Sequence, residues 1–109
     1  MAEDVGVAQE FVTTVIDLST ATSQDVTSGP CVVRATSVNA LMSAHTAALN
    51  DSAGVEKAVI PASSPVGYEK VHFDTTMNGI TVASDGSAEG EIAIVWKPFS
   101  NPLPFTPAG

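Results

Sequence analysis

The chain has a single cysteine and few cations, and both shortages exclude classes of protein. Cys31 is the only cysteine among 109 residues, which excludes an intramolecular disulfide and a zinc site built from two or four cysteines. Only four cations stand against 12 acidic residues, for a formal charge of −8. Because neutralising phosphates needs a basic stripe, we expect no direct nucleic-acid partner. The four cations are Arg34, Lys57, Lys70 and Lys97.

Long apolar runs are also missing. None approaches the roughly 18 to 20 residues that a membrane span needs, so we expect no membrane partner. The opening Met-Ala-Glu-Asp lacks the basic start of a secretion signal, and we expect the mature chain to begin here, in solution. A single domain of this size can bury roughly 65% of the surface that its unfolded chain exposes, so it requires neither disulfide nor metal.

β-branched residues are abundant, and they indicate the fold class. Val, Ile and Thr fill 30 of 109 positions, and they suit a pleated, half-buried surface better than a helix. Clusters of Gly, Pro, Asn, Asp and Ser interrupt the apolar runs about every 8 to 12 residues, as in sandwiches and barrels. We predict an all-β fold: a small antiparallel β-sandwich, jelly-roll-like or Greek-key, over residues 10–97. Extended arms are predicted over residues 1–9 and 98–109.

Alternation of apolar and polar side chains predicts the first strands. Residues 10–18 form one predicted strand and residues 31–39 the next, with a polar loop over 19–29 between them. Pro30 can occupy only a strand start or edge. Residues 40–45 fit a single helical turn, an irregular crossing or a strand start equally well.

Turn sequences predict the later strands. Asp51-Ser52-Ala53-Gly54 predicts a hairpin between residues 46–50 and 55–61, and residues 61–67 break the pattern. Alternation resumes over residues 68–74, and Asn78-Gly79 predicts a turn.

The last two predicted strands, residues 79–83 and 91–96, are expected to be hairpin partners joined by residues 84–90. The predicted core residues are Ile80, Val82, Ile92, Ile94 and Trp96.

Nucleophilic catalysis would need a cysteine or serine beside a base, and His45 and His72 are the only bases near neutral pH. His72 and Asp74 point the same way on one predicted strand, so Cys31, His72 and Asp74 are a candidate catalytic group. Nothing in the sequence brings Cys31 to the other two, and a lone cysteine is commonly a small buried thiol. We therefore expect that the protein is not an enzyme.

Metal and cofactor sites are not expected either. The candidate ligands are His45, His72, Asp51 and Asp74. Their spacing matches no zinc, calcium or phosphate-loop signature. The acidic residues 85–91 lack the length and flanking helices of a calcium loop and predict a hairpin turn. Asn50-Asp51-Ser52 matches a glycosylation sequon, but with no secretion signal before it we interpret it as a turn.

Proline punctuates the last twelve residues, and no strand ladder can continue through them. A proline-spaced segment is extended and loses little conformational entropy when it docks. We predict an arm that lies on another molecule, with a tail folded back on its own domain as the open alternative. The predicted partner-binding residues of this arm are Phe99, Pro102, Leu103, Pro104 and Phe105.

The order of several segments resembles a family of small bacteriophage proteins. These segments are Gly29-Pro30-Cys31-Val32-Val33-Arg34-Ala35-Thr36-Ser37-Val38-Asn39, Leu41-Met42-Ser43-Ala44-His45-Thr46, Asn50-Asp51-Ser52-Ala53-Gly54, Ile60-Pro61-Ala62-Ser63-Ser64 and Phe73-Asp74. They look like those of head-decoration, or capsid cement, proteins, over about residues 11–97. The resemblance implies no catalytic residue.

The family's role sets the functional expectation. The resemblance implies a structural virion protein on the outer capsid surface, assembled in the host cytoplasm, that stabilises the shell by bridging neighbouring major capsid subunits. A homo-oligomer, trimer or dimer, would fit such positions. The alternative is a carbohydrate- or receptor-binding β-domain of a phage tail or head fibre. Trp96 and Tyr68 are the only residues of their kinds, which leaves little for stacking on sugars.

Overall fold

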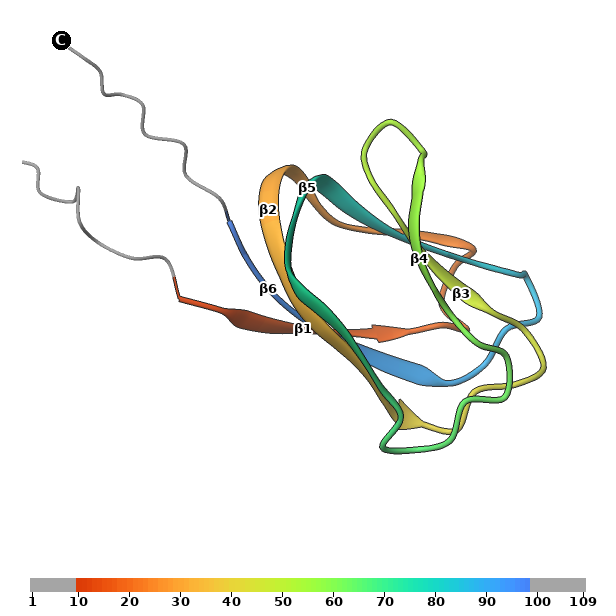
Figure 1. Cartoon of the computed structure of the whole chain (residues 1–109). Helices are drawn as coiled ribbons and strands as arrows, with labels where there is room; N and C mark the ends of the chain where they lie inside the picture. The colour runs from red at the N-terminus through yellow and green to blue at the C-terminus, as the bar shows by residue number, and fades with distance from the viewer. Residues whose placement is uncertain (1–9, 99–109) are drawn as a thin grey trace, which may run out of the picture.

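The computed structural model describes residues 10–98, and within them it contains strands and loops but no helix (Figure 1). The six strands are β1 (Val12–Asp17), β2 (Ser23–Ala40), β3 (Ala47–Asn50), β4 (Glu56–Ile60), β5 (Glu69–Ser84) and β6 (Glu91–Pro98). The predicted all-β class is confirmed. The predicted arms, residues 1–9 and 98–109, lie outside the described residues except for Pro98. Pro98 ends β6 and is paired with Cys31, so the predicted arm boundary is wrong by one residue.

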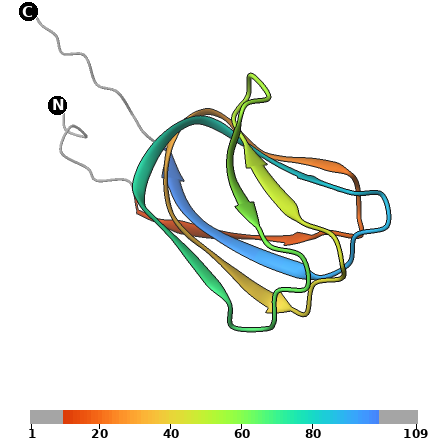
Figure 2. The ribbon, with the colours of Figure 1, turned by 45° about the vertical axis from the view of Figure 1, so that its right-hand side comes forward.

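All six strands hydrogen bond in one antiparallel sheet, in the order β1-β6-β2-β5-β3-β4. The two long strands β2 and β5 curve strongly, so the sheet curls over on itself (Figure 2). The sandwich in the prediction is not confirmed, because hydrogen bonds join every strand into a single sheet. The core fills the inside of the curl.

The predicted loop over residues 19–29 is wrong for its second half, because β2 begins at Ser23. Its polar start pairs with β5 alone, because β6 joins only from Cys31 onward, and none of residues 23–30 is fully buried. Pro30 sits at a register shift, just before the β6 ladder begins. The N–H that proline lacks therefore interrupts no continuous ladder.

The predicted turn at Asn78-Gly79 is also wrong, because both residues lie inside β5. Gly79 has φ +101°, and a Cβ there would come within 2.9 Å of the Ser52 side chain. Ser52 N donates to Asn78 O at 3.0 Å. The glycine therefore serves a close approach between β5 and the turn after β3, rather than a chain reversal.

Residues 79–83 and 91–96 are strands as predicted, but they are not hairpin partners. β5 pairs with β2 and β3, whereas β6 pairs with β1 and β2. The intervening loop instead carries the chain across the curl. By contrast, the predicted hairpin at residues 51–54 is confirmed as the β3–β4 pair, with Asp51 Oδ1 accepting from Ala53 N and Val55 N.

The predicted core is confirmed at four positions. Ile80, Val82, Ile92 and Ile94 are almost fully buried. Trp96 is half-buried against this core, and its Nε1 donates to Thr14 Oγ1 at 2.9 Å. The remaining large members of the core include Leu18, Val33, Val38, Leu49 and Ile60.

Candidate functional site

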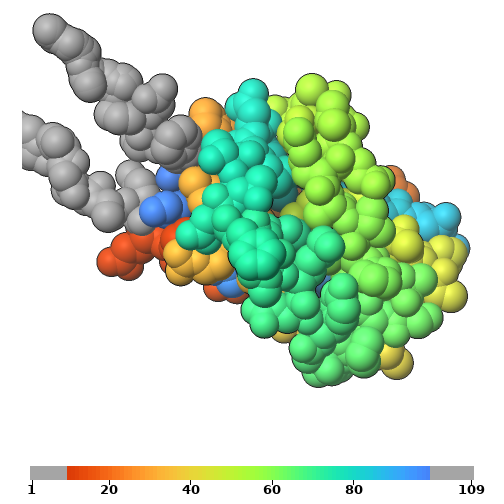
Figure 3. Space-filling view, viewed as in Figure 1, coloured from red at the N-terminus to blue at the C-terminus, as the bar shows by residue number. Residues whose placement is uncertain are grey.

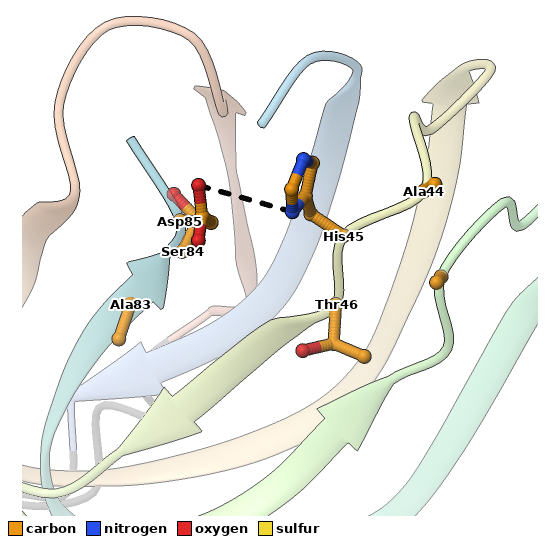
Figure 4. Close-up of a pocket in the computed structure, with 7 residues that line it drawn as sticks. Ala44, His45, Thr46, Ala83, Ser84 and Asp85 are labelled. Carbon is orange, nitrogen blue, oxygen red and sulfur yellow. Dashed lines mark ion pairs between the residues drawn. The ribbon is translucent and has the colours of Figure 1, made fainter. Parts of the chain in front are cut away.

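A shallow pocket lies beside the loop after β5 (Figure 4). Its volume is about 470 Å³, and its lining residues are Ala44, His45, Thr46, Ala62, Ala83, Ser84 and Asp85. His45 Nδ1 lies 3.8 Å from Asp85 Oδ1, too far for a hydrogen bond. The Ser84 hydroxyl donates to the carbonyls of Leu18 and Ala21 and not to His45. The pocket therefore lacks an activated nucleophile.

The structure does not bring Cys31, His72 and Asp74 together. Cys31 is fully buried, its Sγ lies 3.5 Å from Met77 O, and burial raises the pKa of its thiol. His72 Nε2 lies 2.9 Å from Thr36 Oγ1. Burial, with a smaller effect from the charge of Lys70, lowers the pKa of His72. A buried thiol with a raised pKa is a poor nucleophile, so this group has no catalytic geometry.

The candidate metal ligands are likewise dispersed. Within residues 10–98, no three His, Cys, Asp or Glu side chains gather in a group that could hold a metal ion. Asp51 is used by the β3–β4 turn, and Asp85 Oδ1 accepts from Ser87 N at 2.9 Å inside its own loop. The same part of the chain contains no helix long and apolar enough to span a membrane.

A bulge in β5 is the most unusual feature of the surface. Val33 and Ala35 of β2 pair with Thr75 and Val71 of β5, so three residues of β5 lie opposite a single residue of β2. Two residues in this bulge, Phe73 at φ +56° and its successor at +55°, adopt the left-handed conformation. That conformation costs most residues roughly 1–2 kcal/mol, but glycine, asparagine and aspartate tolerate it, so Phe73 carries the strain. Phe73 is also 86% exposed, so burial does not offset the cost.

Arg34 fastens this bulge to β2. Its Nε and Nη2 donate to the two carboxylate oxygens of Asp74 at 3.0 and 3.1 Å, in a forked pair. These hydrogen bonds, followed by the charges of Arg34 and Lys97, hold the pKa of Asp74 below its usual value. At such exposure the ion pair adds little stability, but its two bonds fix the orientation of the strained backbone.

Two cations also gather on one aromatic ring beside the bulge. Arg34 Cζ lies 3.6 Å and Lys97 Nζ 4.9 Å from the centroid of the Phe11 ring, within cation–π distance. We call Phe11, Arg34, Phe73, Asp74 and Lys97 the bulge patch. It lies at the end of the domain where β1 begins and β6 ends (Figure 1).

Sequence reasoning missed the bulge patch as a site. Phe73 entered as one position in an alternating strand, and Asp74 as part of a catalytic group that does not form and as a candidate metal ligand. Phe73-Asp74 was also one of the segments that carried the resemblance, but neither residue was predicted to bind a partner. The bulge arises from unequal numbers of residues on two strands far apart in sequence, which the local alternation does not encode. The predicted arm residues Phe99, Pro102, Leu103, Pro104 and Phe105 lie outside the described residues.

In comparisons with known proteins, no family model, no curated protein and no solved structure matches the chain. The resemblance to head-decoration proteins therefore stays a prediction. The functional interpretation depends on the chain's own surface.

Proposed function

We propose that the chain is a structural protein that attaches to the outer surface of a phage capsid and bridges neighbouring major capsid subunits. The bulge patch would be its anchor. The observation that carries the proposal is Phe73, which is 86% exposed on left-handed backbone next to Asp74, the residue that Arg34 binds. Such strain persists only where the surroundings enforce it, and it concentrates at functional positions.

An exposed aromatic side chain suits an anchor energetically. Binding energy at protein interfaces concentrates in a few residues that insert into well-packed pockets. The fixed backbone of Phe73 lowers the conformational entropy that docking would cost. Around it, the first half of β5 crosses the front of the molecule uncovered (Figure 3), which leaves room for a partner's surface.

Charge favours one kind of partner surface. The whole chain carries −8, yet the bulge patch holds two of the four cations, Arg34 and Lys97, against the single carboxylate of Asp74. This local excess of positive charge complements an apolar pocket edged by acidic groups. The acidic remainder would keep the free protein soluble before attachment.

No observation favours the alternative, a carbohydrate- or receptor-binding domain. Sugar sites present clustered aromatic rings, and the pocket of Figure 4 is lined by no phenylalanine, tyrosine or tryptophan. The bulge patch holds two phenylalanines, but cations already cover the ring of Phe11. A patch of this size binds weakly alone, so a decoration protein would rely on many simultaneous contacts across a repeating shell.

Co-sedimentation tests the proposal. Shells assembled from the major capsid protein of the phage that encodes this chain would be mixed with the full chain and pelleted. We expect saturable binding and a higher melting temperature of the shell. Phe73→Asn should weaken binding at least about tenfold, as for an interface hot spot. Val66→Asn is the matched control, because Val66 is 63% exposed on the loop before β5 and should bind normally.

Two results would contradict the proposal. One is an unchanged shell melting temperature with the full chain added to saturation. The other is equal retention of Phe73→Asn and Val66→Asn on the shells, which would remove the bulge patch as the anchor.

A further inference from the structure

The two edges of the sheet are unlike each other. The β4 edge has five residues, includes Lys57 and is followed at once by Pro61, both of which discourage a further strand. β1 forms the other edge, with the sequence Val-Thr-Thr-Val-Ile-Asp, in register with β6 throughout. It contains no lysine, proline or bulge. Such an edge is a template for another strand.

The free side of β1 is open. Four of its six residues are exposed, and among them Val15 is 53% exposed. Within residues 10–98, the backbone of Val12–Ile16 forms hydrogen bonds only with β6. Among the described residues, the N–H and C=O groups on this side of β1 therefore have no partner.

We propose that β1 pairs antiparallel with β1 of a second copy of this chain, joining two six-stranded sheets into one across a twofold axis. An antiparallel pair of identical strands is self-complementary, as a twofold interface requires. β-branched residues such as Val12, Thr13 and Val15 also suit cross-strand contacts.

The faces of β1 restrict the register. Ile16 is buried in the core and Thr14 bonds to Trp96, so even-numbered residues point into the curl and odd-numbered ones point out. Residues opposite each other must lie on the same face of a continuous sheet. Placing Thr14 opposite Thr14 of the second copy satisfies this rule. It sets Thr13 against Val15 and Val12 against Ile16.

Charge complementarity selects the same register. With Thr14 at the axis, Asp17 of the second copy lies opposite Phe11, whose ring carries Arg34 and Lys97. Both bonds that Asp17 accepts from Ser19 use Oδ1, so within residues 10–98 its Oδ2 accepts no hydrogen bond and could approach these cations. Moving the axis to Thr13 would instead set Phe11 against Val15. Because the twofold axis relates the two copies, the selected register places Asp17 of each copy beside Arg34 and Lys97 of the other.

Arg34 and Lys97 would take part in both proposed contacts, but the test uses the full chain without any shell, so failure of the dimer and failure of shell attachment are separate results. Sedimentation velocity across micromolar concentrations should show a dimer for the native chain. Val15→Lys should shift it to monomer, because a lysine on the outer face discourages strand addition. Val55→Lys is the matched control: Val55 is 51% exposed near the opposite edge and should leave the dimer intact.

A native chain that is monomeric throughout overturns the inference, whether the edge is free or covered by the chain's own terminal residues. A trimer overturns it too, because twofold pairing closes at two copies. If the Val15→Lys variant has the circular dichroism of a folded sheet and is still a dimer, the interface lies elsewhere. That result also overturns the inference.

A second variant tests the register. Asp17→Asn keeps Oδ1 as acceptor for Ser19 but removes the charge, and should weaken the dimer about threefold or more at low salt, with less effect at high salt. Glu56→Gln, at the β4 edge, should leave the dimer unchanged. Equal weakening by both variants, or none by Asp17→Asn, overturns the selected register.

Discussion

Replacing Phe73 with asparagine should make the fold more stable, although it removes a large apolar side chain. At φ +56°, the left-handed conformation of phenylalanine lowers the free energy of unfolding by roughly 1–2 kcal/mol. Asparagine avoids most of this cost because its short polar side chain tolerates that conformation. Full burial of a phenylalanine is worth about 1.5–3 kcal/mol. At 86% exposure, only about 0.3 kcal/mol of this is lost.

The net gain is therefore about 0.5–1 kcal/mol, which corresponds to a rise in Tm of roughly 3–6 °C for a domain of this size. Thermal unfolding of the full chain, followed by circular dichroism, measures it. Val66→Asn controls for the new side chain, since Val66 is exposed without positive φ, and its Tm should stay within about 2 °C of the native value. A fall in Tm for Phe73→Asn would refute the strain argument, because it would mean that Phe73 packs on its own domain.

Two further substitutions test the fold. Burial lowers the pKa of His72 in the folded chain, so as the pH falls the imidazole is protonated in the unfolded chain before it is protonated in the folded one. The free energy of unfolding should therefore decrease as the pH drops below about 6.5. Chemical denaturation at several pH values should show a smaller decrease in the free energy of unfolding for His72→Gln than for the control His45→Gln. Equal decreases in the two variants would exclude His72 as the cause. Gly90→Ala should cost at least about 1–2 kcal/mol, because Gly90 has φ +119° and an added Cβ would lie 2.9 Å from Met42 Cα. Gly29→Ala, with open space around it, should be nearly neutral, and a similar loss in both variants would contradict this reasoning.

Local patterns predicted the parts of the fold that depend on neighbouring residues. Alternation placed β1, and the Asp51 turn placed the β3–β4 hairpin, because a turn's geometry is set by the side chains within it. Ile92 and Ile94 were identified as core because every second residue of a strand shares a face.

Long-range pairing decided the rest. β2 begins at Ser23 among polar residues because its partner β5 supplies the hydrogen bonds, which the sequence around Ser23 does not reveal. Asn78-Gly79 is a typical turn sequence, so Gly79 was predicted to lie in a turn. In the structure its positive φ instead allows a close approach to Ser52 in the middle of a strand. The bulge at Phe73 depends on the register between β2 and β5, so alternation along β5 alone could not predict the site.

A cryo-EM map of shells of the proposed capsid partner, saturated with the full chain, tests the central claim most directly. The account predicts copies at repeated positions on the outer surface, each with Phe73 inserted in an apolar pocket of the shell and Arg34 beside it. A shell without added density, or copies attached with Phe73 facing solvent, would contradict it.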